Sequence, residues 1–374
     1  MRLPSSTIAF LVLMLLVSNA SAQDVWFGTS TSAKGESKGI YHARFDPETG
    51  KLSQATLAAE IASPGFLALH HAKPLLYSVG RAEGEPSVAA FSIEKDGKLT
   101  LINTQPIGDG GAAHLAVHPA GKMLISAQYG GGSTAVFPLD EEGKIGARSQ
   151  LLKHEGGTGI VKGRQDKPHA HWTGFDKAGN FAFVPDLGMD GAVIYKVTKD
   201  GTALENHGFG KSEAGGGARH MKFSPDEKLA FILNELTLSV TSFSYDAKAG
   251  TLTPITTVPA LSEEVKAQET FNSASEICVH PNGKFIYSAN RGHDTITVYN
   301  HDGKGGLTVV EVEPIRGSWP RNFNLDPSGR WLLAAGQNSS TVAVFAIDQE
   351  TGKLSFPRGA VINVPTPICV LFGR

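Results

Sequence analysis

Cysteine is scarce in this chain of 374 residues, which contains only Cys278 and Cys369. Two cysteines are too few for a disulfide framework, and because both lie in apolar runs typical of strands, we expect two buried free thiols. An excess of positive charge is also absent, since 34 Lys and Arg residues stand against 36 Asp and Glu residues. Without a basic stripe to neutralise a phosphate backbone, nucleic acid is excluded as a partner.

Long apolar runs are missing everywhere except at the N-terminus, where residues 8–17 form one. Arg2 precedes this run, and the small residues Ala20-Ser21-Ala22 follow it. A run this short, followed by a small-x-small cleavage pattern, predicts a secretory signal peptide over residues 1–22 rather than a spanning helix. No cysteine lies near it, so no lipoprotein anchor is indicated. We therefore expect an exported protein, periplasmic or extracellular, with no membrane attachment after cleavage.

Helical patterning is nearly absent as well. The best helix candidate is the short segment 262–270, which lies in a connection. The 43 glycines and 20 prolines instead suit the many tight turns that a protein of short strands requires. The composition thus favours an all-β fold.

One unit recurs along the chain. It consists of an apolar strand, a turn built on Pro or Gly, a second strand that ends near Asn or Gly, and two further strands. Its copies start 46 to 57 residues apart, at Phe66, Leu115, Trp172, Met221, Ile277 and Phe323. A period of about fifty residues with four short strands per unit is typical of a β-propeller.

The two ends of the chain supply one further unit in two pieces. The N-terminal part carries only later strands, at residues 25–29, 39–45 and 52–60, and the C-terminal part carries only a first strand, Thr366–Phe372. Pairing these pieces would close the ring and remove an open sheet edge. We therefore predict a single domain over residues 23–374, a seven-bladed β-propeller with four antiparallel strands per blade. We expect this domain to be a monomer.

Polar and charged residues occur at corresponding ends of the first two strands of each unit. In GARHMKFSPDEKLAFILNEL, for example, Arg219 and His220 come at the start of the first strand and Glu235 follows the second. Because these two strands are antiparallel, both ends must emerge on the same rim of the ring. The residues expected on this rim are His114, Gln128, Tyr129, His169, His171, Asp186, Arg219, His220, Glu235, Glu276, Asn290, Arg291, Arg321 and Gln337. The opposite rim carries ordinary turn residues.

Three arginines on one channel mouth repel one another unless an anion lies among them. Glu235 can neutralise one of them. The excess positive charge predicts a bound carboxylate, a bound phosphate or a developing oxyanion. An anionic small molecule is therefore the expected partner.

The chain closely resembles the seven-bladed propeller lactonases of the 6-phosphogluconolactonase type, to which carboxymuconate lactonising enzymes are related. The resemblance covers the mature chain and is carried by six motifs in order: GIYHARFDPETGKL, HLAVHPAGK, PHAHWTGFDKAGNFAFVPDLG, GARHMKFSPDEKLAFILNEL, SANRGHDTITVY and WPRNFNLDPSGRWLLAAGQNSSTVAVF. It implies ring-opening hydrolysis of a sugar lactone, or the related lactonisation, with no cofactor and no obligatory metal. The resemblance places catalytic groups at His171, Arg219, Glu235 and Arg291, and Arg321, His220 and Gln337 match other motif positions of the family on the same rim. We expect these three residues and His169 to bind the substrate.

Hydrolysis of a lactone needs an activated water, a stabilised oxyanion and a proton for the leaving oxygen. Either Glu235 or His171 could act as the base, while Arg219 and Arg291 would hold the oxyanion or an anionic substituent and Arg321 would orient the sugar. No Gly-x-Ser-x-Gly elbow occurs, so a serine nucleophile has no support. His169 and His171 lie on one side of a strand as metal ligands do, but Asp186 is the only obvious third ligand, and we expect no metal.

Two other functions remain open at this point. A cycloisomerase would use the same arginines for the carboxylates of a muconate, and a propeller can also serve as a binding platform without catalysis. The chain departs from the lactonase pattern at Gly80-Arg81, where many relatives have Asn-Glu. The predicted signal peptide also separates the protein from phosphorylated sugar lactones, which are cytosolic.

Overall fold

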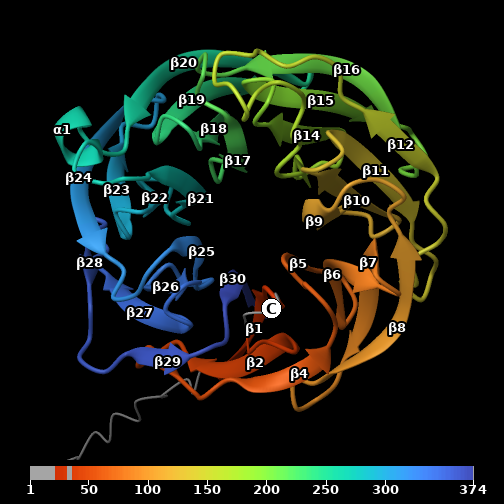
Figure 1. Cartoon of the computed structure of the whole chain (residues 1–374), viewed down its shortest axis with the longest axis horizontal. Coiled ribbons are helices and arrows are strands. Elements are labelled where there is room, and N and C mark those ends of the chain that lie inside the picture. The colour runs from red at the N-terminus through yellow and green to blue at the C-terminus, as the bar shows by residue number, and fades with distance from the viewer. Residues whose placement is uncertain (1–21, 32–35, 374) are drawn as a thin grey trace, which may run out of the picture.

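The computed structural model describes residues 22–31 and 36–373 as a ring of seven antiparallel sheets around a central channel (Figure 1). The prediction of a seven-bladed propeller with four antiparallel strands per blade is therefore confirmed. The predicted signal peptide lies outside the described residues except for Ala22. Within the described ranges, no helix is long and apolar enough to cross a membrane.

Five blades are each formed by four consecutive strands, numbered here from the channel outward. One consists of β5 (Leu67–Leu69), β6 (Leu75–Ala82), β7 (Glu85–Ile93) and β8 (Leu99–Pro106). The next consists of β9 (Ala112–Val117), β10 (Met123–Gln128), β11 (Ser133–Pro138) and β12 (Gln150–Lys153). The third consists of β13 (Gly174–Phe175), β14 (Phe181–Asp186), β15 (Gly191–Val197) and β16 (Leu204–Lys211).

The last two of these blades follow the same plan. One consists of β17 (Ala218–Phe223), β18 (Leu229–Asn234), β19 (Ser239–Asp246) and β20 (Thr251–Pro259). The other consists of β21 (Ser273–Val279), β22 (Phe285–Arg291), β23 (Thr295–His301) and β24 (Leu307–Pro314). Between these two blades, the helix α1 (Glu263–Lys266) is capped by Ser262 and is shorter than the predicted segment 262–270.

In the two remaining blades the outermost strand is broken into two pieces. One blade consists of β25 (Pro320–Leu325), β26 (Trp331–Gly336), β27 (Thr341–Ile347) and the pieces β28 (Leu354–Ser355) and β29 (Val361–Asn363). The other consists of β30 (Pro367–Phe372), β1 (Gln23–Thr29), β2 (Gly39–Asp46) and the pieces β3 (Lys51–Leu52) and β4 (Thr56–Glu60).

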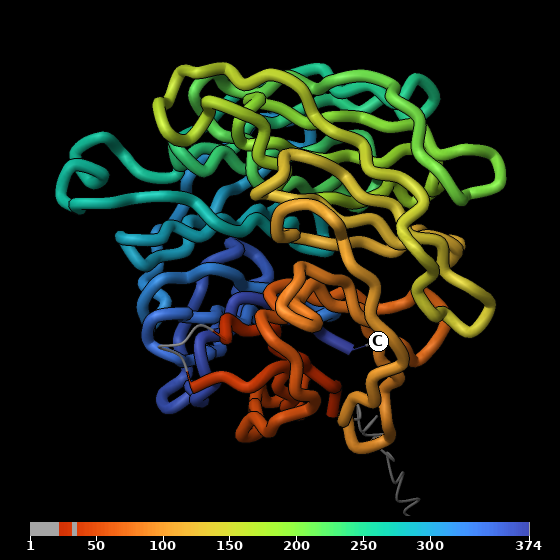
Figure 2. The backbone as a smooth tube through the Cα atoms, turned by 45° about the vertical axis from the view of Figure 1, so that its right-hand side comes forward, coloured from red at the N-terminus to blue at the C-terminus, as the bar shows by residue number. Residues whose placement is uncertain are grey.

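The last strand of the chain closes the ring, as predicted. β30 pairs antiparallel with β1, so that the innermost strand of this blade comes from the C-terminus and the others from the N-terminus. In Figure 2 the blue C-terminal segment accordingly lies beside the red N-terminal strands. The closure leaves no unpaired first strand in this blade, and it thereby removes the edge that an open sheet would expose.

The hydrophobic core is divided among the seven interfaces between neighbouring blades. Each of seven buried clusters draws its side chains from two adjacent sheets. Because the second strands are covered on both faces, β10, β14 and β18 are buried along their whole length, which explains why they appear in the sequence as continuous apolar runs. Cys278 and Cys369 are free and buried, as expected.

Strand β30 contributes to two of these clusters. Val370 and Phe372 pack in the interface with the blade of β25, and Cys369 packs in the interface with the blade of β5. Removal of this strand would therefore open two interfaces at once and would also unpair β1.

Deletion of the last ten residues, 365–374, should therefore destabilise the whole ring rather than one blade. We expect a fall in the melting temperature of more than about 10 °C, or loss of soluble protein, because the lost burial exceeds that of any single core side chain. A milder variant, Phe372→Ala, should lower the free energy of unfolding by about 3–5 kcal/mol, as measured by denaturant unfolding. The matched control is Phe209→Ala, since Phe209 is 42% exposed, and equal melting temperatures for these two point variants would contradict the prediction.

Candidate functional site

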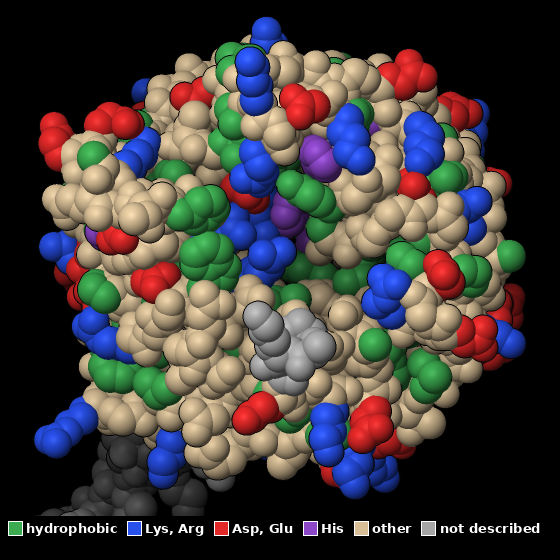
Figure 3. All heavy atoms as spheres, viewed as in Figure 1, with side chains coloured by type: hydrophobic (Ala, Val, Ile, Leu, Met, Phe, Trp, Pro, Cys, Tyr) green, Lys and Arg blue, Asp and Glu red, His purple; other side chains and the backbone are tan. Residues whose placement is uncertain are grey.

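One mouth of the central channel contains two adjoining cavities. The larger, here called the arginine cavity, has a volume of about 450 Å³ and is lined by Gly111, Ala112, Ala113, Tyr129, Arg164, His171, Glu235, Phe271, Arg291 and Arg321. The smaller, here called the inner cavity, has a volume of about 100 Å³ and is lined by Gly65, Phe66, Ala112, Ala113, His171, Arg219, His220, Arg321 and Ile368. Figure 3 shows one face of the ring, with Lys, Arg and His side chains gathered at a central hollow.

Irregular strand pairing directs several of these side chains into the channel. At the rim end of the innermost strands, one residue has no partner on the second strand: Arg219 in β17, Arg321 in β25 and Ala113 in β9. Ile368 in β30 is unpaired in the same way. Such β-bulges bend a strand and redirect a side chain, and they are common beside active sites. Here they place a residue from several blades around one opening.

Glu235 is the only carboxylate among the described residues that line the two cavities. Its Oε1 accepts a hydrogen bond from Arg164 Nη2 at 2.6 Å, and its Oε2 accepts one from Arg219 Nε at 2.8 Å. Arg291 Nη2 lies 3.2 Å from the same Oε2. Burial by itself raises the pKa of a carboxyl group, but Arg291 and Arg219 outweigh it and hold the pKa of Glu235 well below its usual range. Glu235 therefore remains an anion at neutral pH.

The backbone around Glu235 is fixed from both sides. Its N–H donates to the carbonyl of Gly217 at 2.8 Å, and its carbonyl accepts from the N–H of Ala274 in the next blade at 2.9 Å. Gly217 has φ of +69°, and a side chain there would lie 2.7 Å from an atom of Leu236. A glycine is therefore required at this position, and it helps to set the depth of the carboxylate in the channel.

Arg219 uses its hydrogen-bond donors within the protein. Besides Glu235, its Nη1 donates to the carbonyl of Ser275 and lies 3.0 Å from Nε2 of His220. The other ring nitrogen of His220, Nδ1, lies 2.8 Å from Glu276 Oε1. Since Arg219 can only donate, His220 must accept at Nε2 and carry its proton on Nδ1. Burial, and then the neighbouring Arg291, lower the pKa of Arg219 to about 9, so it stays charged at neutral pH.

Arg321 is the guanidinium group without a partner. Among the described residues it has neither an ion pair nor a hydrogen-bond acceptor, although it lines both cavities. Burial, and then the charge of Arg291, lower the pKa of Arg321. Arg291 itself donates to the carbonyl of Ala274 through Nη2, while its buried Nε has no acceptor. Both side chains can therefore bind an incoming anion without breaking an existing contact.

His171 lies between the two cavities and lines both. Its Nε2 is 4.0 Å from Glu235 Oε2, and its ring contacts Tyr129 and His220 edge-on at 5.3 Å each. Its Nδ1 is buried and has no hydrogen-bond partner. Burial, together with the nearby charge of Arg219, holds the pKa of His171 well below its usual value. The imidazole is therefore neutral and can accept a proton.

Five residues of the arginine cavity were not among the rim residues expected from the sequence: the small residues Gly111, Ala112 and Ala113, and the larger residues Arg164 and Phe271. Arg164 lies in the connection between β12 and β13, which Gln165 anchors by donating to the carbonyl of Leu187 and to Asp190 Oδ1 at 2.9 and 2.5 Å. Phe271 lies in the connection that also contains α1. These connections account for the two longest intervals between repeat starts, 57 and 56 residues. The unusual length of these two repeats was thus the signal in the sequence that could have indicated the two connections.

Other residues expected on this rim lie outside both cavities. His169 stacks on Tyr129 with ring centroids 4.5 Å apart. Gln337 has a buried Oε1 without a partner, but it does not line either cavity. Asp186 lies 2.7 Å from Nδ1 of His154 and also accepts from the N–H of His169. No group of three or more His, Cys, Asp or Glu residues in the described ranges could hold a metal ion.

The expected position of His114 needs correction, whereas Gln128 and Asn290 do lie at this end of their strands, opposite Ala112 and Ala274, but line neither cavity. His114 is not on this rim: because β9 begins at Ala112, it lies deeper in the channel and faces the opposite mouth. Gln128 instead contacts Ser126 and Ser133, and Asn290 contacts two threonine hydroxyls of its own blade. Glu276 is buried and accepts from His220, Asn322 and its own neighbour in the chain.

The site thus combines four guanidinium groups, one carboxylate and two neutral buried imidazoles, of which His220 is hydrogen-bonded at both nitrogens and His171 has an unpartnered Nδ1. The four arginines are Arg164, Arg219, Arg291 and Arg321, and the carboxylate of Glu235 balances one positive charge. The remaining positive charge favours an anion, and the imidazole of His171 can take up a proton beside it. The sequence prediction of His171, Arg219, Glu235, Arg291 and Arg321 on one channel mouth agrees with this geometry.

Known proteins share this sequence and architecture. A family model described as "Lactonase, 7-bladed beta-propeller" matches residues 24–372. A Bacillus subtilis protein named 6-phosphogluconolactonase is 36% identical over 350 residues, which cover 91% of this chain and 96% of that protein.

Solved structures have the same fold over nearly the whole chain. A protein from Lactobacillus plantarum has a TM-score of 0.87 and 31% identity, covering 94% of this chain and 100% of its own. The periplasmic gluconolactonase of Pseudomonas aeruginosa has a TM-score of 0.86 and 26% identity, covering 95% of this chain and 99% of its own. Together with the family match, these similarities show that the chain belongs to the seven-bladed β-propeller lactonase family.

Proposed function

We propose that this protein hydrolyses a sugar lactone, opening an aldonolactone ring with an activated water molecule. The observation that carries the proposal is the arginine cavity, where Arg291 and Arg321 have unused donors beside the neutral His171. Attack of water on a lactone carbonyl creates an oxyanion, and the ring-opened product carries a carboxylate. Both anions suit a cavity with excess positive charge. Relatives named as lactonases support the same reaction class.

In the proposed mechanism His171 is the base. We assign this role to His171 rather than to Glu235 because the carboxylate of Glu235 is paired with three guanidinium groups, whereas His171 Nδ1 has no hydrogen-bond partner. His171 takes a proton from water as the oxygen bonds to the carbonyl carbon. It then gives that proton to the ring oxygen as the carbon–oxygen bond breaks, so that lactone and water become a hydroxy acid.

The four arginines have different parts in this mechanism. Arg321 and Arg291 stabilise the oxyanion, because they line the cavity and have free donors. Arg219 and Arg164 instead hold Glu235, and Glu235 in turn holds Arg291 near His171. Arg219 is thus a positioning residue rather than a group that touches substrate.

We further propose that the natural substrate is an unphosphorylated aldonolactone outside the cytoplasm. The predicted signal peptide directs the protein to an exported compartment, and phosphorylated sugar lactones are cytosolic. The similarity to a periplasmic gluconolactonase supports the same location. No phosphate is then needed to explain the arginines, because the oxyanion and the product carboxylate supply the negative charge.

A substrate panel tests the function. Purified mature protein is incubated with gluconolactone, with its 6-phosphate and with carboxymuconate, and product formation is compared with the spontaneous rate. We expect gluconolactone to be opened at least about 100-fold faster than in buffer, since a positioned base alone contributes this much. Consumption of carboxymuconate without lactone hydrolysis would make the protein a cycloisomerase, and no turnover of any of them would favour a binding protein.

His171→Ala should lower kcat for gluconolactone by about 100-fold or more, because it removes the proposed base. The melting temperature should change little, since His171 Nδ1 has no hydrogen bond to lose and its contact with Glu235 is long. Steady-state kinetics and thermal unfolding of the same preparation provide the measurement. The control is His207→Ala on an exposed strand. Full activity of the His171 variant would rule out this residue as the base.

Arg321→Met should lower kcat by about 100-fold on gluconolactone and on its 6-phosphate alike, because loss of one oxyanion donor costs this much. The matched control is Arg330→Met, since Arg330 pairs with Glu48 on the outer surface. A change in KM for the 6-phosphate alone, with kcat intact, would instead assign Arg321 to a phosphate group and contradict its role at the oxyanion.

A further inference from the structure

The opposite mouth of the channel contains a second and larger cavity, here called the opposite cavity. Its volume is about 800 Å³, within the range of small-molecule sites. Pro119 and Pro327, which belong to the hairpin turns of the rim opposite the arginines, lie at its edge. The cavity is thus a separate feature of the other face.

Three aromatic rings separate the opposite cavity from the proposed active site. The centroids of Phe66 and His114 are 3.9 Å apart, and both rings approach His220, at 6.0 and 5.7 Å. Phe66 and His114 line the opposite cavity, whereas Phe66 and His220 line the inner cavity. A molecule in the opposite cavity therefore does not reach the arginines.

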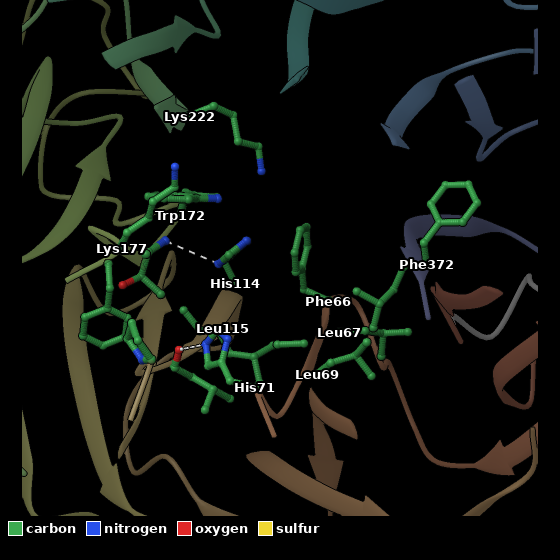
Figure 4. A pocket seen from close by; sticks show the side chains of 18 of the residues that line it. Phe66, Leu67, Leu69, His71, His114, Leu115, Trp172, Lys177, Lys222 and Phe372 are labelled. Carbon is green, nitrogen blue, oxygen red and sulfur yellow. Dashed lines mark hydrogen bonds between the residues drawn. The ribbon is translucent and has the colours of Figure 1, made fainter. Parts of the chain in front are cut away.

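The walls of the opposite cavity are mainly apolar. Figure 4 shows Phe66, Leu67 and Phe372 on one side of the open space, with Trp172 and His114 facing them. These rings and aliphatic chains come from the innermost strands of several blades and from the turn before β13. They would bury the body of an apolar ligand.

Polar groups on the other wall are donors. Lys222 extends into the space in Figure 4, and its Nζ lies 5.6 Å from the Trp172 ring centroid. The N–H of Thr173 reaches Nδ1 of His114 at 3.4 Å, so the neutral His114 ring carries its proton on Nε2. Trp172 is 7% exposed, and its Nε1 has no acceptor among the described residues.

Few acceptors compete for these donors. Glu276 Oε1 forms a long ion pair with Lys222 Nζ at 4.0 Å, which is beyond hydrogen-bond distance, and the same oxygen accepts a hydrogen bond from His220. Asp176 also lines the cavity, but its carboxylate accepts from the backbone N–H groups of its own turn and from the hydroxyl of Tyr245. Among the described residues Lys222 Nζ thus has one long ion pair and no hydrogen-bond acceptor, and such an ammonium group beside an apolar wall suits an anion with an apolar body.

We propose that the opposite cavity binds an organic carboxylic acid with an apolar or aromatic body. The carboxylate pairs with Lys222 and accepts from Nε2 of His114, while the apolar body packs against Phe66 and Trp172. This site is independent of the lactonase reaction, because it shares no donor with the arginine cavity.

Phenylacetate is a suitable probe, and calorimetric titration of the purified protein measures its binding. We expect saturable binding with a dissociation constant in the millimolar range or below, and no saturation with the neutral isostere phenylacetamide. Lys222→Met should raise the dissociation constant at least about tenfold, as expected for loss of a charge-assisted contact. Trp172→Ala, which removes the ring against which the apolar body packs, should raise it at least about threefold.

Two control variants separate this site from its alternatives. Lys228→Met removes a lysine of the same rim whose side chain is 82% exposed, and it should leave binding unchanged. Arg321→Met should also leave binding unchanged, because Arg321 lines only the other mouth. The proposal fails if phenylacetate does not bind, if Lys222→Met binds as tightly as the parent protein, or if Arg321→Met abolishes binding. Thermal unfolding of each variant shows that the fold is retained.

Discussion

The carboxylate of Glu235 is the interaction on which the site depends. It lies among Arg164, Arg219 and Arg291, each of which would otherwise repel the others in a buried space. Two like charges 4 Å apart interact by about 4 kcal/mol at the effective dielectric constant of a protein. One anion therefore makes a cluster of cations possible, yet it leaves the cluster positive. That residual charge turns a structural ion-pair network into a site for an external anion.

The ring geometry makes this concentration of charge possible. Antiparallel pairing brings the start of each first strand and the end of each second strand to the same rim, and the β-bulges at Arg219 and Arg321 turn these side chains into the channel. The blades themselves pack through apolar side chains at seven interfaces, and Arg219, Arg321 and Glu235 belong to none of these clusters. The rim residues are consequently free to serve a chemical purpose.

The sequence predicts the fold almost completely, because every copy of the repeat shows the same pattern of four strands and the copies can be counted as blades. It also brings His171, Glu235 and three arginines to one mouth, since antiparallel topology alone decides which ends meet. Arg164 and Phe271 could not be found that way, because they lie in connections that follow no repeat. Strand topology likewise predicts the rim near which a residue lies, but not how deep its side chain lies in the channel. His114 was therefore expected beside the arginines and instead faces the other mouth.

The middle of the channel explains why one pore contains two different environments. Phe66, His114 and His220 meet there, and burial keeps the pKa of both imidazoles well below the usual value, so that neither ring is charged. Charge at this depth would be costly unless paired, and the one carboxylate present, Glu276, is fully hydrogen-bonded. The arginines thus lie at one mouth, while the cavity at the other mouth has mainly apolar walls and two lysines, Lys177 and Lys222.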